Sequence, residues 1–86
     1  MSLDTFDPSA ATVSQIKSSI ESAIVGAEVA VQAASAGHFE IDVTSDAFAG
    51  KSMVQQQQLV YAAIKELMAG DGAPVHAIDR LRTKTP

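Results

Sequence analysis

Apolar residues at spacings of three and four mark the first segment of the chain as a helix. Val13, Ile16, Ile20 and Ile24 fall on one helical face, and Gly26 follows as a natural stop. Asp7-Pro8 suits the helix start, with Pro at the first helical position, and Thr12 with Gln15 offers a second start as a capping box. The pattern predicts a helix ending near residue 26, after a loose leader.

After this helix, apolar and polar residues alternate with a period of two. Residues 27–34 are short and Val-containing, and the stretch from His38 to Asp46 alternates. Phe39, Ile41 and Val43 share one face of that second strand, whereas His38, Glu40, Asp42 and Thr44 share the other. We therefore predict an antiparallel hairpin whose second strand is buried on one side and exposed on the other.

A second helix and a third strand complete the pattern. The helix is predicted from about Met53 to Ala69 and the strand from Pro74 to Leu81, with the Gly70–Gly72 turn between them. Strand, helix and strand imply a right-handed crossover and parallel pairing. The buried stripe of the helix is predicted to comprise Val54, Tyr61, Ile64 and Met68, flanked by Val60 and Leu67.

These elements predict an α+β fold, an α/β sandwich in the order α-β-β-α-β. Its three-stranded mixed sheet would carry helices on one face only. We divide the chain into a flexible leader at 1–10, one domain at 11–82 and a short tail at 83–86. A chain of 86 residues has no room for two cores.

Composition argues against an enzyme. Fifteen of the hydrophobic residues are Ala, which leaves too few large side chains for a deep, closed catalytic cavity. The sequence carries neither a specific Ser-His-Asp arrangement nor a glycine loop of a phosphate-binding type. It also lacks Cys, so this chain cannot build a thiolate site or a disulfide. With no signal peptide and no apolar stretch of membrane length, we expect a cytoplasmic protein.

Two histidines are the candidates for metal chemistry. His76 falls on the predicted third strand, on one side with Ile78 and Arg80, and His38 opens the second strand. Neutral imidazole is a common ligand of iron, zinc and copper. The alternative for His76 is a strand histidine satisfied by a backbone or carboxylate partner, and for His38 a polar residue on the exposed face or at the end of the hairpin. If the two strands are parallel neighbours, both histidines lie at one end of the sheet. Two imidazoles make an incomplete site, so further ligands would come from elsewhere.

Charge distribution leaves a nucleic-acid interpretation open. The net charge of −4 divides into −6 over residues 1–50 and +2 over residues 51–86. The second half could meet an anionic partner, but base-stacking aromatics are scarce and the positive charge is small. The residues that could contact a partner or nucleic acid are Gly50, Lys51, Gln56, Gln57, Lys65, Arg80 and Arg82.

The stretch "GHFEIDVTSDAFAGKSMVQQQQLVYAAIKEL", followed by "VHAIDRL", resembles the BolA family, and its short-loop, IbaG-like branch in particular. The resemblance runs from about Thr12 to Arg82. Its strongest elements are His38-Phe39, Phe48-x-Gly50, Val60-Tyr61 and Val75-His76-Ala77. It implies an α-β-β-α-β core related to the class II KH domain, usually with a closing C-terminal helix that would begin near the last residues here.

The resemblance also implies a partner and a cofactor. BolA-like proteins pair with monothiol glutaredoxins that carry a Cys-Gly-Phe-Ser motif, and the two share a [2Fe–2S] cluster with glutathione, which this chain would not bind alone. The glutaredoxin and glutathione each supply a cysteine, and the third-strand histidine, here His76, supplies another ligand. Ala36 falls where some relatives carry a loop Cys, which leaves His38, a carboxylate or water as the remaining ligand.

Some family members are described as DNA-binding regulators. They carry Arg-His-Arg early in the second helix, where this chain has Gln56, Gln57 and Gln58. Glutamine can read a base edge but cannot neutralise phosphate. We therefore expect a non-enzymatic protein of iron–sulfur trafficking or iron regulation, with a nucleic-acid-binding transcriptional or stress regulator that uses the KH-like groove as the alternative.

Overall fold

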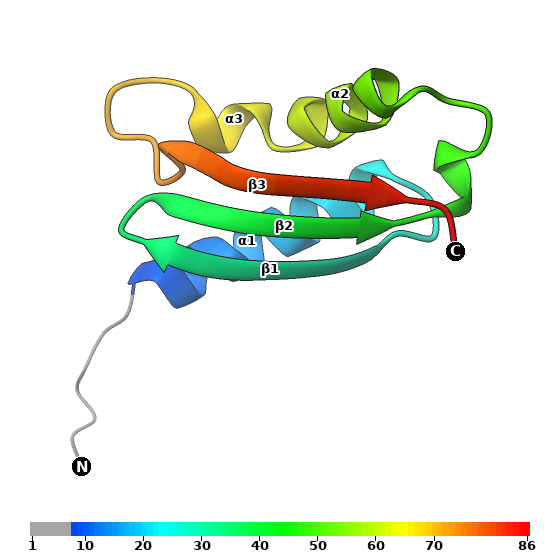
Figure 1. Ribbon diagram of the computed structural model, residues 1–86. Helices are drawn as coiled ribbons and strands as arrows, with labels where there is room; N and C mark the ends of the chain where they lie inside the picture. The colour runs from blue at the N-terminus through cyan, green and yellow to red at the C-terminus, as the bar shows by residue number, and fades with distance from the viewer. Residues whose placement is uncertain (1–7) are drawn as a thin grey trace, which may run out of the picture.

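A computed structural model describes residues 8–86 and shows a three-stranded sheet with helices on one face (Figure 1). The strand order is β1-β2-β3, with β1 (Glu28–Ser35) antiparallel to β2 (His38–Thr44) and β2 parallel to β3 (Ala77–Lys84). The helices are α1 (Pro8–Ala23), the short 3-10 helix η2 (Asp46–Phe48), α2 (Met53–Ala63) and α3 (Lys65–Met68). The predicted α+β architecture is confirmed. None of the described helices is long and apolar enough to cross a membrane.

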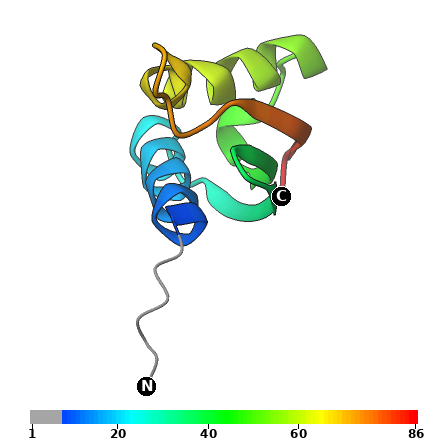
Figure 2. The same cartoon turned by 90° about the vertical axis from the view of Figure 1, so that its left-hand side faces the viewer.

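One apolar layer between the helices and the sheet forms the core. The view along the strands shows that the helices lie on one side of the sheet (Figure 2). The α1 stripe, the alternating residues of β2 and the inner face of α2 meet there. The buried residues of this core are Ile16, Ile20, Ile24, Val29, Phe39, Ile41, Val43, Phe48, Val60, Ile64 and Val75.

The helix predicted from Met53 to Ala69 is divided at Ile64 into α2 and α3. Ile64 has φ −110° and ψ 11°, outside the helical region. The predicted buried stripe was partly wrong, because Val54 and Tyr61 are 63% and 40% exposed. The predicted Ile64 is buried, and Met68 and the flanking Leu67 are half-buried against the core. The flanking Val60 is also buried, and two glutamines described below complete the inner face.

The first helix begins at Pro8, the first of the two predicted starts. The strand β3 continues to Lys84, so the two elements extend beyond the expected limits of 11 and 82. Most of the expected leader, residues 1–7 including Asp7 of that start, lies outside the described residues.

The third strand begins three residues later than the predicted Pro74. The backbone N–H of Val75 donates to the carbonyl of Leu67 in α3 at 3.1 Å, so this residue is tied to a helix and not to β2. His76 therefore lies immediately before β3.

A bulge in β3 changes which residues share a face. Phe39 pairs with Ile78 but Glu40 pairs with Arg80, so Asp79 is an extra residue. An uninterrupted register would have turned Arg80 toward the core and Leu81 outward. The predicted common side for Ile78 and Arg80 is therefore wrong. The bulge keeps Arg80 on the open face and lets Ile78 and Leu81 both pack against the core.

Candidate metal-ligand site

His76 is exposed at the end of the sheet where β2 and β3 begin. Its backbone N–H donates to the carbonyl of Gly37 at 2.8 Å, and the N–H of Ala77 donates to the same oxygen at 3.1 Å. Gly37 belongs to the two-residue turn between β1 and β2, since Ser35 pairs with His38. Two hydrogen bonds to one carbonyl thus fix the backbone of His76 against the hairpin.

The imidazole of His76 lies over Gly37. A β-carbon built on Gly37 would lie 2.5 Å from Nδ1, 2.7 Å from Cγ and 3.1 Å from Cε1 of that ring. Gly37 also has φ +75°, a conformation that favours glycine. The close approach needs a residue without a side chain, and the Nδ1 edge of the ring is the edge held against the turn. The Nε2 edge is the one turned away from Gly37.

His38 has a polar partner at the same end of the sheet. Its Nδ1 lies 2.8 Å from Oδ1 of Asp79, and the two side chains are 41% and 42% exposed. Asp79 is the extra residue of the β3 bulge, and its carboxylate lies on the open face because the preceding residue, Ile78, faces the core.

The predicted meeting of the two histidines at one end of the sheet agrees with the register. His38 pairs with Ala77, the residue that follows His76, in the parallel β2–β3 ladder. Within residues 8–86, however, no group of three His, Asp or Glu side chains is arranged to hold a metal ion. Two imidazoles suit an iron ion as ligands, but they leave its coordination incomplete. Any metal centre at these histidines would therefore need ligands from a second molecule.

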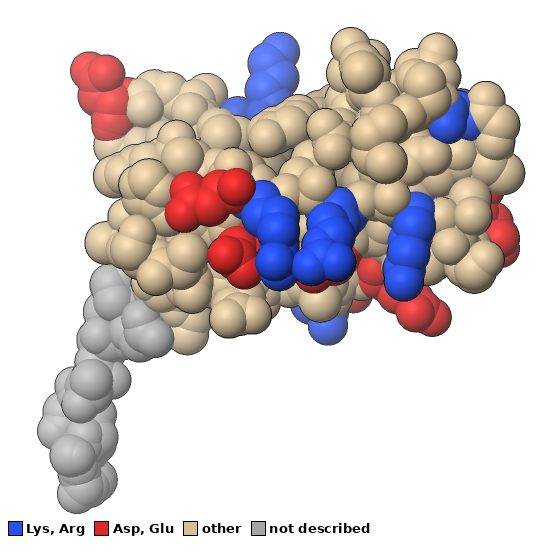
Figure 3. All heavy atoms as spheres, in the orientation of Figure 1, with Lys and Arg blue, Asp and Glu red and all other residues tan. Residues whose placement is uncertain are grey.

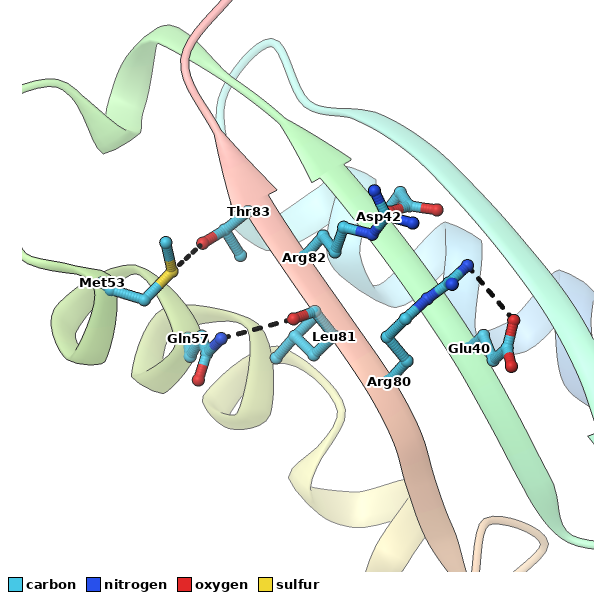
Figure 4. Close-up of polar contacts among 8 residues, drawn as sticks. All are labelled: Glu40, Asp42, Met53, Gln57, Arg80, Leu81, Arg82 and Thr83. Atoms are coloured by element: carbon cyan, nitrogen blue, oxygen red, sulfur yellow. Dashed lines mark hydrogen bonds and ion pairs between the residues drawn. The ribbon is translucent and has the colours of Figure 1, made fainter.

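Gln56 and Gln57, predicted to contact a partner, are engaged within the molecule. Gln57 donates from Nε2 to the carbonyl of Leu81 at 3.3 Å, and Gln56 accepts from the hydroxyl of Thr83 at 2.8 Å. Met53 also contacts that hydroxyl through its sulfur (Figure 4). The first half of α2 thus covers the outer edge of β3 with amide groups.

Arg80 and Arg82 lie on the open face of the sheet, each beside an acid of β2. Arg80 is 3.3 Å from Glu40, and Arg82 is 3.6 Å from Asp42 (Figure 4). The space-filling view shows basic side chains in a row across this face, with acidic groups next to them (Figure 3). A hollow of about 540 Å³ on this face is lined by Glu28, Val29, Ala30, Asp42, Val43, Thr44, Arg82 and Lys84.

Gly50 and Lys51 lie at the other end of the sheet from the histidines. They follow η2, which comes directly after the carboxyl end of β2, and they line a surface hollow of about 490 Å³ with Gln55, Gln58 and Leu59. Lys65 begins α3, above the start of β3 (Figure 1). The predicted contact residues are therefore spread over several surfaces.

Sequence reasoning missed two residues at the histidine end, Gly37 and Asp79. A glycine immediately before the second strand signals a turn, but not that a ring from a distant strand would lie on it. Asp79 was visible as an acid of the third strand, but its contact with His38 depends on the register between two strands that are distant in sequence.

The comparisons with known proteins point to one family. The model of the BolA family, described as BolA-like protein, matches residues 4–86. BolA-like protein 1 of Mus musculus is 44% identical over 57 residues, which cover 66% of this chain. The matched segment spans only 39% of the mouse protein's length.

Solved structures show the same fold. A BolA homologue from Coxiella burnetii has a TM-score of 0.70 at 30% identity, covering 85% of this chain and 88% of its own. The BolA domain of SufE1 from Arabidopsis thaliana has a TM-score of 0.73 at 27% identity, covering 87% and 92%. The names of these relatives do not specify a branch of the family, so the IbaG-like branch stays a prediction. Because the family model spans nearly the whole chain, this protein belongs to the BolA-like family.

Proposed function

We propose that this protein is a non-enzymatic adaptor that binds a monothiol glutaredoxin and shares a [2Fe–2S] cluster with it. The observation that carries the proposal is His76, whose exposed ring lies on Gly37 with its Nε2 edge turned away. A ligand held on a fixed backbone and open to solvent suits a metal centre completed by another molecule.

The absence of cysteine determines what the partner must contribute. Iron in such clusters is bound mainly by thiolates, and His replaces Cys only in part in mixed sites. This chain has no Cys, so every thiolate would come from the glutaredoxin and from glutathione. A reducing cytoplasm keeps such thiols available, and we place the protein there.

The position of His76 restricts where the glutaredoxin docks. The imidazole lies on the β1–β2 turn at Gly37, and the preceding residue, Val75, is tied to α3 through the Leu67 carbonyl. A partner that reaches the ring would contact the turn around Gly37 and the surface that begins at Lys65. Lys51, at the far end of the sheet, would lie outside a compact footprint.

The test is anaerobic co-purification with a monothiol glutaredoxin and glutathione, followed by iron and sulfide determination and visible circular dichroism. We expect a heterocomplex that contains iron and sulfide in equal amounts, with a spectrum different from that of the glutaredoxin alone. His76→Ala should remove that difference, whereas Gln32→Ala, on the exposed part of β1, should preserve it.

Two results would contradict the proposal. A heterocomplex without iron would make the protein a metal-free interaction module. A His76→Ala complex whose spectrum equals that of the unaltered protein would show that this imidazole is not a ligand.

A further inference from the structure

The Asp79–His38 contact lies at the bulge of β3. Regular pairing needs one β3 residue opposite Glu40, but the bulge provides two, Asp79 and Arg80. The guanidinium of Arg80 is directed to Glu40 at 3.3 Å, while the Asp79 carboxylate is directed to His38. Asp79 and Arg80 thus both lie on the open face, and each is directed to a different residue of β2.

This contact determines which nitrogen of His38 is available. A carboxylate can only accept, so Nδ1, 2.8 Å from Oδ1 of Asp79, carries the proton in the neutral ring. The lone pair is then on Nε2. Histidines that bind metals commonly donate their other ring N–H to a carboxylate, which fixes the tautomer and the orientation of the ring.

We propose that Asp79 is a positioning residue that holds His38 as an Nε2 ligand, the second ligand that this chain offers beside His76. The inference rests on the proposed function. The sequence left His38, a carboxylate or water as the remaining cluster ligand. The inference selects His38, because the carboxylate of Asp79 is already hydrogen-bonded to its imidazole.

The alternative is a structural ion pair. Exposed pairs stabilise a fold by less than about 1 kcal/mol, so stability alone would hardly distinguish the two roles. The tautomer of His38 and the stability of the cluster do distinguish the two roles. A purely structural pair does not require the lone pair to be on Nε2, and its loss would not change the stability of the cluster.

The first experiment uses the free protein labelled with ¹⁵N at histidine. Long-range ¹H–¹⁵N spectra, recorded where both imidazoles are neutral, report the tautomer of each ring. We expect His38 protonated at Nδ1 in the unaltered protein and in Asp79→Asn, whose amide oxygen also accepts. Asp79→Ala should shift the proton toward Nε2. The control Asp42→Ala, which removes an acid paired with Arg82 on the same face, should leave His38 unchanged.

The second experiment measures loss of iron from the glutaredoxin complex. We expect His38→Ala and Asp79→Ala each to accelerate it by about tenfold or more, the scale known for residues that hydrogen-bond to a metal-binding histidine. The rate of iron loss from the Asp79→Asn complex should be closer to that of the unaltered protein. The rate for Asp42→Ala should equal that of the unaltered protein.

The outcomes separate the two proposals. If His76→Ala alters the spectrum but His38→Ala and Asp79→Ala leave the rate of iron loss unchanged, the proposed function stands and this inference is wrong. An Nε2-protonated His38 in the unaltered protein overturns the positioning role, whatever the complex does. If His76→Ala has no effect, the ligand role of His38 loses its basis along with the proposed function.

Discussion

The imidazole of His76 lies on the α-carbon of Gly37, a residue 39 positions earlier in the chain. The same glycine accepts hydrogen bonds from the backbone of His76 and of Ala77. One turn residue therefore sets both the start of β3 and the placement of the candidate ligand. The site depends on the hairpin as much as on the histidine.

Gly37→Ala tests this dependence. The positive φ of Gly37 costs a residue with a β-carbon about 1–2 kcal/mol, and the new methyl group would displace the ring of His76. We expect a lower free energy of unfolding in urea and shifted ring resonances of His76. Gly72→Ala is the control, since Gly72 lacks a positive φ and a methyl group there would meet no described atom within 4 Å. Equal stability and unchanged ring resonances in both variants would contradict the role of Gly37.

Gln56→Ala should destabilise the fold. The hydroxyl of Thr83 is in a residue only 5% exposed and donates to Gln56, which in turn donates to the carbonyl of Lys51 at 3.0 Å. Removing the amide leaves these groups poorly satisfied, at a cost of about 1–3 kcal/mol. Chemical denaturation measures the loss, with the exposed neighbour Gln58→Ala as the control. Matching unfolding curves for the two variants would show that the amide contacts contribute nothing.

Ser45→Ala should cost a similar amount at the far end of the sheet. Its hydroxyl is buried, donates to the carbonyl of Val25 at 2.7 Å and accepts from the N–H of Ala47 at 3.0 Å. Its loss removes the cap of η2 and a link to the loop after α1, for about 1–3 kcal/mol. Thermal unfolding compared with Ser18→Ala, on the exposed side of α1, measures the difference. A melting temperature equal to that of the control would refute this expectation.

Single-stranded DNA should bind weakly or not at all, even at low salt. Arg80 and Arg82 already face Glu40 and Asp42, and the net charge of the chain is −4. Fluorescence anisotropy with a labelled oligonucleotide measures this, and the double variant Glu40→Gln/Asp42→Asn should raise any affinity by freeing both guanidinium groups. Tight binding by the unaltered protein, with a steep salt dependence, would favour the nucleic-acid alternative.

Most of the fold could be predicted from the regular spacing of apolar residues along the chain. The helical stripe of Ile16, Ile20 and Ile24 and the alternation of Phe39, Ile41 and Val43 both became core, because each pattern has one period and one buried face. The parallel β2–β3 pairing also followed from the order of elements.

The second helix and the third strand departed from their patterns for physical reasons. In α2, amides cover the edge of β3, so polar Gln56 and Gln57 occupy the inner face while apolar Val54 faces solvent. In β3, the bulge at Asp79 changed the phase of alternation without any glycine or proline to signal it. The candidate ligands were visible as residue types, but their neighbours Gly37 and Asp79 depend on contacts between distant segments.

The parallel course of β2 and β3 keeps the histidine end and the Gly50–Lys51 turn apart. Seven residues of β2 at the usual strand rise separate them by about 20 Å. A small globular protein docked on the imidazoles would leave the opposite end uncovered. The surface around Gly50 and Lys51 would thus remain accessible to solvent while the histidine end is covered.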